Sequence, residues 1–427
     1  MYIWANINEM SKKNYSPESL MMSYGYTPEW SEGAIKCPIY QTSTFVFKTA
    51  EEGKSFFEIA YGIRERAAGE KIPGLIYSRL NNPDIEILEN RIALWDNADD
   101  CASFESGMSA ITTVMLEYLA PGDFILASSP SYGGTDHFIK HFLTKMHIHH
   151  IEYFPWDSEE DILKRIDEAG ARDKVKLIFT ESPANPTNDL FDIAMLVNLG
   201  KKLSHGDHVV KVAVDNTYMG PLWQKPLDMG ADFSIYSATK YIGGHSDVIA
   251  GAVCGKQDDM IRIKTLRTFL GNMAGPWTAW LLMRSLETLK IRMEQQARNA
   301  AEVAEFLNNH PKVGKMHYLG NLTPADGHAY EIYKRQYTSP GAMLSFQIVG
   351  GEAEAFRFLN GLRLCKLAVS LGSTESLAEH PGTMTHAGVD PDLKAKIGIT
   401  PNLVRLSVGV ENAADLIDDL NQALALV

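Results

Sequence analysis

The chain is poor in cysteine, and its cysteines lie far apart. Cys37, Cys101, Cys254 and Cys365 are separated by at least 64 positions, the interval from 37 to 101. No CxxC pair and no zinc-type spacing therefore occurs. Isolated thiols of this kind are typical of a cytosolic protein that keeps them reduced. We expect neither a disulfide framework nor a metal centre.

Long hydrophobic runs and an excess of positive charge are also missing. No segment has the roughly 18 uninterrupted apolar residues of a membrane-spanning helix, and the amino terminus has no basic start before a hydrophobic stretch, as a secretory signal would. The 53 acidic and 40 basic residues give a formal net charge of -13. Nucleic acids and anionic membranes bind basic faces. We expect a cytoplasmic protein with neither kind of partner.

The middle of the chain alternates between strands and helices. The 427 residues, 45% of them hydrophobic, predict two or three globular domains. Short β-rich runs occur at 175–180, 209–214 and 233–236, and a helical stretch at 193–203 separates the first two. This alternation predicts an α/β domain whose parallel sheet is covered by helices.

The pattern changes towards the carboxyl terminus. From about residue 286, a long helix is followed by alternating strands and helices, which indicate a separate α+β domain. The mixed charges of residues 255–267 indicate a helix in solvent. Residues 1–80 show little regular pattern. We predict an arm over 1–80 that contacts a neighbouring subunit, a large α/β domain over 81–285 and a smaller α+β domain over 286–427.

Polar side chains follow each of the three predicted strands. In open α/β sheets, ligands bind at the carboxyl edge of the strands. We therefore expect one set of side chains to converge at that edge: Glu181, Asn185, Asp215, Ser237, Thr239 and Lys240.

The type of these side chains suggests a particular chemistry. A lysine at a strand end is usually a solvated charge. Here, however, the hydroxyls of Ser237 and Thr239 can bind phosphate oxygens, and Asp215 can pair with a ring N–H. A helix that begins at Gly107 offers free backbone N–H groups to an anion. Together with Lys240, these are the parts of a pyridoxal phosphate site.

Nine motifs, in order along the chain, carry a family resemblance: "YSRLNNP", "SGMSAI", "PSYGGT", "ESPANPT", "DNTY", "SATKYIGGHSDVIAGAV", "SLGSTESL", "HPGTMTHAG" and "RLSVGVE". From about Gly33 to its end, the chain resembles the cysteine/methionine-metabolism, or trans-sulfuration, family of pyridoxal phosphate enzymes. This family includes cystathionine γ-synthase, cystathionine γ- and β-lyases, methionine γ-lyase and homoserine-ester sulfhydrylases. The resemblance implies the fold-type-I architecture, with a mostly parallel central sheet in the large domain and a smaller α+β carboxyl-terminal domain.

The resemblance also implies which residues bind the cofactor. Lys240 would hold pyridoxal 5'-phosphate covalently and act as the base. Asp215 would bind the pyridine nitrogen, and Tyr132 would stack on the ring. The phosphate would be held by Ser237, Thr239 and the backbone of Gly107 and Met108.

A further set would bind the substrate and link the subunits. Arg405, with Ser370 and Asn185, would bind the substrate carboxylate or the 3'-oxygen of the cofactor. Tyr77 and Arg79 would reach the phosphate of a neighbouring subunit, so that each site would need two chains. The resemblance therefore implies a homotetramer built as a dimer of dimers, and it implies no metal.

The sequence departs from the family pattern at several positions. Gly134 stands where the best-known methionine γ-lyases carry a cysteine. Val369 stands where many cystathionine γ-lyases and γ-synthases carry a glutamate for the distal amino group of their substrate. Asp84 replaces the threonine that usually follows "NP", for which we have no functional account. A polar insertion, "RERAAGEK", precedes Tyr77, and we read it as a surface loop.

We predict a carbon-sulfur lyase that eliminates a thiol from cystathionine-type thioether amino acids and yields a 2-oxo acid and ammonia. The choice between β- and γ-cleavage stays open. Cystathionine γ-synthase, acting on an O-acylhomoserine, is the first alternative, and methionine γ-lyase follows because of Gly134. Of the other classes, a nicotinamide enzyme lacks its GxGxxG signature here. A non-catalytic binding protein on the same fold does not need the intact Lys240 and Asp215.

Overall fold

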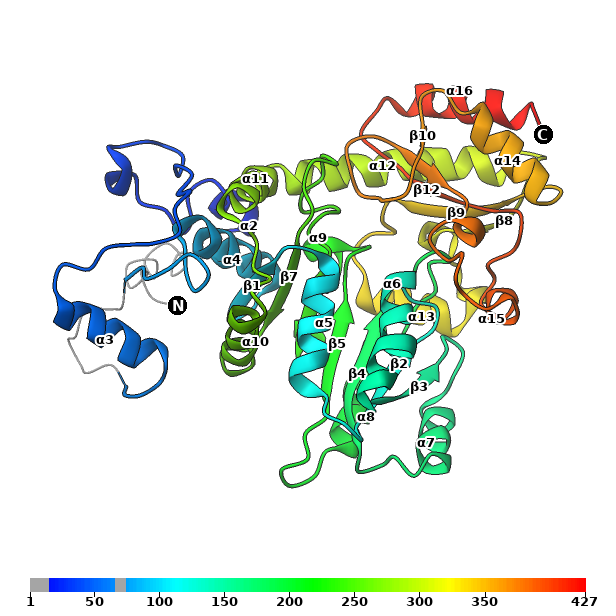
Figure 1. Ribbon diagram of the computed structural model, residues 1–427. Helices are drawn as coiled ribbons and strands as arrows, with labels where there is room; N and C mark the ends of the chain where they lie inside the picture. Colours follow the sequence, from blue (N-terminus) through cyan, green and yellow to red (C-terminus); the bar gives the residue numbers. More distant parts are fainter. Residues whose placement is uncertain (1–14, 66–73) are drawn as a thin grey trace.

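The chain forms two β-sheets surrounded by helices (Figure 1). The computed structural model describes residues 15–65 and 74–427. The long helix α12 (Leu289–Asn308) leads from the part with the larger sheet into the part with the smaller one. Among the helices of the described residues, none combines the length and the hydrophobicity needed to cross a membrane.

The larger sheet has seven strands in the order β1-β7-β6-β5-β4-β2-β3, and only β7 runs antiparallel to its neighbours. This confirms the predicted α/β class with a mostly parallel sheet. The predicted strands correspond to β4, β5 and β6, although β5 begins two residues late because Val209 is exposed outside the sheet. The strands are β1 (Asp100–Phe104), β2 (Phe124–Ser128), β3 (His149–Tyr153), β4 (Val175–Glu181), β5 (Lys211–Asp215), β6 (Phe233–Tyr236) and β7 (Gly251–Gly255).

Helices bury both faces of this sheet. In β4, Leu177 and Phe179 belong to the core under α5 and α10, whereas Ile178 belongs to the core under α7 and α8, as the alternation of side chains along a strand requires. Helix α8 has the predicted bounds. The helices of this part are α4 (Pro83–Asp96), α5 (Gly107–Tyr118), α6 (Gly133–His137), α7 (Glu159–Glu168), α8 (Ile193–Leu203), α9 (Gly220–Trp223), α10 (Gln257–Leu270) and α11 (Pro276–Leu286).

The predicted exposure of the charged segment 255–267 is wrong in part. The segment lies in α10, but Met260, Ile263 and Arg267 are buried. Arg267 forms an ion pair with the buried Glu89 of α4. A mixed-charge pattern cannot distinguish a charge that faces water from one that is paired inside.

The smaller sheet has five strands in the order β10-β11-β12-β9-β8. Helices α12, α14 and α16 pack on it around Phe346 and Phe358. The predicted α+β character of this part is therefore confirmed. Its strands are β8 (Val313–His317), β9 (Met343–Ile348), β10 (Lys366–Leu367), β11 (Leu377–Glu379) and β12 (Leu403–Ser407), and its other helices are α13 (His328–Gln336), α14 (Glu352–Gly361), α15 (Pro391–Lys396) and α16 (Ala413–Leu424).

The segment before α4 extends away from the larger sheet (Figure 1). Its described residues, 15–65 and 74–82, include the α-helices α2 (Pro17–Leu20) and α3 (Ala50–Ala60), and a bridge joins Thr44 and Tyr77. Most of the predicted insertion before Tyr77 lies outside the described residues, which resume at 74.

Candidate active site

A cavity of about 490 Å³ lies at the carboxyl ends of β4, β5 and β6, where the sequence predicted a site. Its walls also include the start of α5 and residues of the part with the smaller sheet. All but two of the residues predicted for cofactor and substrate line it: Gly107, Met108, Tyr132, Asn185, Asp215, Ser237, Thr239, Lys240, Ser370 and Arg405.

Lys240 lies in the turn that follows β6, and its amine faces this cavity. Nζ donates a hydrogen bond to Ser370 Oγ at 2.8 Å. Burial, followed by the nearby positive charge of Arg405, lowers the pKa of Lys240 to about 8, although Glu379 acts in the opposite direction. An amine with such a pKa can lose its proton near neutral pH, as a nucleophile or a general base must.

Asp215, the last residue of β5, has hydrogen-bond donors on only one of its two carboxylate oxygens among the described residues. Its Oδ1 accepts hydrogen bonds from the backbone N–H of Thr217 at 3.0 Å and from Thr217 Oγ1 at 2.6 Å. Among the described residues, none donates to Oδ2. Burial raises the pKa of Asp215, so a positively charged donor at Oδ2 would stabilise the carboxylate.

Thr217 is a residue that the sequence analysis missed. Besides its two bonds to Asp215, its Oγ1 accepts a hydrogen bond from the backbone N–H of Ser237 at 2.9 Å. It therefore ties the end of β5 to the turn that carries Lys240. A Thr two positions after an Asp is a common local hydrogen-bonding pattern, and this spacing was the available signal.

Glu181, the last residue of β4, places a second carboxyl group beside Asp215, its register partner on β5. Oε2 accepts from the backbone N–H of Tyr132 at 2.6 Å, and Oε1 accepts from that of Asn185 at 2.8 Å. Glu181 thereby fixes the segments that carry both residues. Burial, followed by the charge of Asp215, raises the pKa of Glu181 to about 8. The two carboxyls consequently titrate as a pair.

The start of α5 provides an anion cradle. Ser106 caps the helix by accepting from the backbone N–H of Ser109, while the N–H groups of Gly107 and Met108 donate to no described residue. A Cβ at position 107 would lie 2.8 Å from Cβ of Ser237, so glycine is needed for this close approach. The free N–H groups and the nearby hydroxyls suit a phosphate.

Arg405 reaches the cavity from β12 of the smaller sheet and is 2% exposed. Nη1 donates to Asn185 Oδ1 at 3.1 Å, and Nη2 donates to the carbonyl oxygen of Ser370 at 2.7 Å. Glu379, which the sequence analysis missed, is fully buried and lies 2.8 Å from Nη1. A guanidinium held in this way can bind a planar carboxylate.

The remaining wall of the cavity is mostly apolar. Its charged side chains, among the described residues, are those of Glu181, Asp215, Lys240 and Arg405. Hydrophobic side chains make up much of the rest: Met108, Ile111, Ile249, Val369, Leu371 and Met384.

Tyr132 and Gly134 occupy one end of this wall. The ring of Tyr132 is 42% exposed and can lie against a planar ligand. A Cβ at Gly134 would lie 2.6 Å from Tyr132 Cε1 and 3.3 Å from Met108 Sδ. A cysteine at 134 would therefore displace the tyrosine ring.

Tyr77 and Arg79 do not line the cavity of their own chain. Arg79 lies over the ring of Tyr77, 5.6 Å from its centroid, and donates through Nη1 to the carbonyl oxygen of Thr268 at 2.9 Å.

The cavity fits pyridoxal phosphate. It offers an amine for the aldehyde, a carboxylate oxygen with no donor for the pyridine nitrogen, and a cradle of free N–H groups for the phosphate. These three features are what the cofactor requires of a protein.

Comparison with known proteins agrees with this geometry. The model of the family described as "Cys/Met metabolism PLP-dependent enzyme" matches residues 18–425. The chain is 40% identical over 403 residues to an L-methionine gamma-lyase of Porphyromonas gingivalis, with 94% of this chain and 95% of that protein covered. It is 35% identical to a cystathionine gamma-lyase of Bacillus subtilis, covering 95% and 98%.

Among solved structures, cystathionine gamma synthase from Xanthomonas oryzae pv. oryzae in complex with cystathionine has a TM-score of 0.83 at 31% identity, and the match covers 96% of this chain and 98% of the other. A match this long confirms the fold-type-I architecture predicted from the motifs. The chain belongs to the family of pyridoxal phosphate-dependent enzymes of cysteine and methionine metabolism.

Proposed function

We propose that this chain is a carbon-sulfur lyase that eliminates a thiol from a thioether amino acid and leaves a 2-oxo acid and ammonia. The observation that carries the proposal is the single cavity in which an amine of lowered pKa, a buried arginine and an apolar wall meet. Relatives named methionine and cystathionine lyases support it.

The cofactor would be held by residues from three neighbouring elements. Lys240 would bind it covalently, and Asp215 would accept from the pyridine N–H through Oδ2. The backbone of Gly107 and Met108 would bind the phosphate, with help from Ser237 and Thr239. When bound, pyridoxal phosphate draws electrons from the substrate α-carbon and so stabilises negative charge there.

Lys240 is the proposed proton carrier. Its Nζ would take the proton from the substrate α-carbon and, for a γ leaving group, one from the β-carbon as well. It could then give a proton to the departing sulfur. The hydrogen bond to Ser370 Oγ holds the amine in place, and a pKa near 8 allows both uptake and release of protons near neutral pH.

Substrate choice would depend on the two ends of the cavity. Arg405 would bind the α-carboxylate, positioned by Asn185 and Ser370. The charged groups that the described residues of one chain bring to the lining are then all in use, and none of them is left for the second amino and carboxyl groups of cystathionine. Val369 and Ile249 suit a small uncharged group beyond sulfur. We therefore propose methionine as a better substrate than cystathionine, which reverses the order of preference predicted from the sequence.

Product analysis tests this function. The purified holoenzyme is incubated separately with methionine, with cystathionine, and with an O-acylhomoserine plus cysteine. We expect 2-oxobutanoate from methionine, at a higher kcat/KM than for cystathionine. Pyruvate from cystathionine would indicate β-cleavage instead, and rapid formation of cystathionine from the third mixture would indicate a γ-synthase. No 2-oxo acid from any mixture would refute the lyase.

The same proposal includes an assembly in the cytoplasm: a homotetramer built as a dimer of dimers. Residues 1–80 would form the arm, 81–285 the cofactor domain and 286–427 the smaller domain. Two features support a shared site: Tyr77 and Arg79 lie outside the cavity of their own chain, and the arm leaves Val46 95% exposed.

The substitution Arg79→Ala tests the shared site. We expect it to weaken cofactor binding about tenfold, because a phosphate loses a charge-assisted hydrogen bond. Arg79→Ala and Lys240→Ala chains are then co-expressed, and activity is measured in the hybrid. A site that combines the intact Lys240 of one chain with the intact Arg79 of the other should recover activity. Hybrids no more active than the Arg79→Ala chains that they contain would contradict the sharing of sites.

A further inference from the structure

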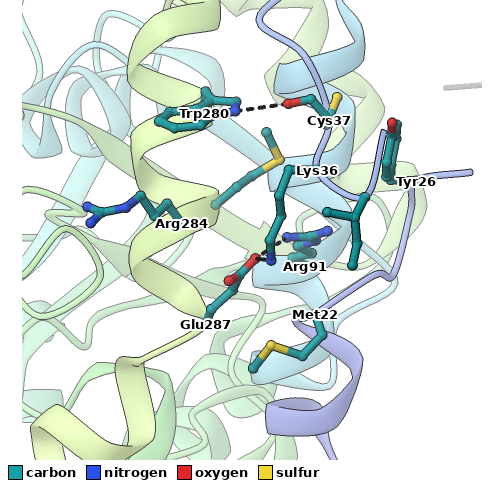
Figure 2. Close-up of a pocket in the computed structure, with 10 residues that line it drawn as sticks. Met22, Tyr26, Lys36, Cys37, Arg91, Trp280, Arg284 and Glu287 are labelled. Atoms are coloured by element: carbon teal, nitrogen blue, oxygen red, sulfur yellow. Dashed lines mark hydrogen bonds and ion pairs between the residues drawn. The ribbon is translucent and has the colours of Figure 1, made fainter. Parts of the chain in front are cut away.

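A second cavity, of about 250 Å³, lies between the amino-terminal segment and helices α4 and α11 (Figure 2). It shares no lining residue with the active-site cavity. We call it the arm pocket, and its lining residues are Met22, Tyr26, Ile35, Lys36, Cys37, Arg91, Trp280, Met283, Arg284 and Glu287. A hydrogen bond of 2.9 Å from Trp280 Nε1 to the carbonyl oxygen of Cys37 fixes the segment against α11.

Arg91 of α4 is the unusual side chain in this pocket, because it is only 5% exposed and most of its donors are unused. Its Nε donates to the carbonyl oxygen of Tyr24 at 2.9 Å. Nη1 lies 3.9 Å from Glu287 Oε1, too far for a hydrogen bond. Within residues 15–65 and 74–427, nothing accepts from Nη1 or Nη2. These donors are therefore free for a ligand in the pocket that Arg91 lines.

The charges in the pocket are unbalanced. Lys36 Nζ lies 2.5 Å from the same Oε1 of Glu287 that Arg91 approaches, and Figure 2 shows both cations directed at this one carboxylate. Arg284, the third cation of the lining, is exposed and points away from Glu287 in Figure 2. Around Glu287, two positive charges therefore share one negative charge. Burial lowers the pKa of Arg91, and Glu287 offsets this only in part. One further negative charge would complete the group.

The rest of the arm pocket decides what kind of anion fits. Met22, Ile35, Met283 and the indole of Trp280 give it apolar walls, as in most small-molecule sites. A doubly charged phosphate would meet the like charge of Glu287. A singly charged carboxylate would leave the group near neutral, and its two oxygens match the fork of an arginine.

We propose that the arm pocket binds a small monocarboxylate with an apolar body. Its carboxylate accepts from the free Nη atoms of Arg91 and from Lys36, and its hydrocarbon part lies between the methionines and Trp280. The site is independent of the proposed function of the main cavity.

Titration calorimetry of the holoenzyme with butanoate tests the proposal, with butanamide, which has the same hydrocarbon part but no charge, as the control. Arg91→Gln should weaken butanoate binding about tenfold, as the loss of a charge-assisted hydrogen bond predicts. Lys36→Gln should weaken it less, because Lys36 is half exposed. Glu287→Gln should strengthen it about threefold by removing a like charge. Arg405 could also bind butanoate, but these substitutions would not change that binding.

Arg91→Gln should weaken butanoate binding, whereas Glu287→Gln should strengthen it. The test therefore remains valid if one of these variants folds poorly. Arg91→Gln can loosen the contact with Tyr24, so thermal unfolding and gel filtration are recorded for each variant. Lys36→Gln alters a half-exposed cation and should leave both unchanged. Glu287→Gln takes the nearby negative charge from the buried Arg91, so it should lower the unfolding temperature while gel filtration stays unchanged. No saturable binding to the native protein, the same Kd in all four proteins, or weaker binding to Glu287→Gln would each overturn the proposal.

Discussion

Two groups of buried charged residues in this molecule differ in how fully their charges are paired with opposite charges inside the protein. One lies between α4, β1 and α10: Glu89, Asp100, Lys264 and Arg267. Here Lys264 lies 3.1 Å from Glu89 and 2.7 Å from Asp100, and Arg267 pairs with Glu89 and donates to the carbonyl oxygen of Ser103 at 2.8 Å. Although burial acts in the opposite direction, Arg267 and Lys264 lower the pKa of Glu89 to about 2.

The active-site group shows the reverse. Burial dominates there: it raises the pKa of Glu181 to about 8, raises that of Asp215 and lowers that of Lys240 to about 8. The charged forms of these groups are less stable than they would be in water. The first group therefore stabilises the fold, whereas the second holds groups whose partners must come from a ligand.

Matched lysine substitutions should give the largest contrast. Lys240→Ala should reduce turnover by at least about 10³-fold, because both the covalent anchor and the proton carrier are lost, while thermal stability is kept. Lys264→Ala should lower stability and leave the kcat of the folded fraction unchanged. Steady-state kinetics and thermal unfolding of both cofactor-free and loaded proteins measure this.

Two results would contradict the expected difference between Lys240 and Lys264. Near-normal turnover of Lys240→Ala would remove Lys240 from the mechanism. A large loss of stability in the cofactor-free Lys240→Ala protein would show that its amine belongs to a matched structural group, like Lys264.

Arginine substitutions test the structural group directly. Arg267→Met should destabilise the protein by about 3 to 5 kcal/mol, because it leaves the buried Glu89 short of a partner. Arg262→Met, on the exposed side of the same helix, is the control. Its side chain is 53% exposed and pairs with Glu117, which is 20% exposed, and surface pairs contribute roughly 0 to 1 kcal/mol. Urea unfolding measures both, and equal effects would contradict a special role for the buried pair.

The sequence allowed prediction of the active-site group better than of the structural one. Asp215 and Lys240 each follow a β-rich run, and the carboxyl ends of parallel strands meet at one edge, so local patterns sufficed. The contact between Glu89 and Arg267 spans 178 positions and depends on how α10 packs against α4. No local pattern reports this packing, and the segment around Arg267 was therefore predicted to face solvent.

Side chains that act through other side chains were missed for a related reason. Glu379 is recognisable only once β11 lies beside β12, where it is the register partner of Arg405. The arm pocket likewise depends on a contact between Lys36 and Glu287, which lie 251 positions apart. Family motifs identify the residues that touch ligands. The residues that balance the charges of those groups are brought beside them by tertiary contacts, which the motifs do not report.

The last prediction concerns how the free energy of unfolding changes with pH, and the direction of this change differs between the two groups. The folded-state pKa of Glu89, about 2, lies below the ordinary value of 4.5, so its contribution is present above pH 4.5 and is lost as the pH falls towards 2. That of Glu181, about 8, lies above 4.5, so its contribution is present below pH 4.5 and is lost as the pH rises towards 8.

Each contribution should be of the order of a few kcal/mol, since the two pKa values lie about 2.5 below and about 3.5 above 4.5, and one pKa unit corresponds to about 1.4 kcal/mol. Urea unfolding of the cofactor-free protein between pH 3 and pH 9 should therefore show that Glu181→Gln flattens the decline above pH 4.5, and that Glu89→Gln flattens the decline below it. Bound cofactor should remove the first decline, because a pyridinium N–H at Asp215 stabilises the charge that the two carboxyls share. A decline above pH 4.5 that is as steep in Glu181→Gln as in the native protein would show that this carboxyl is already matched within the fold, and the contrast between the two groups would be lost.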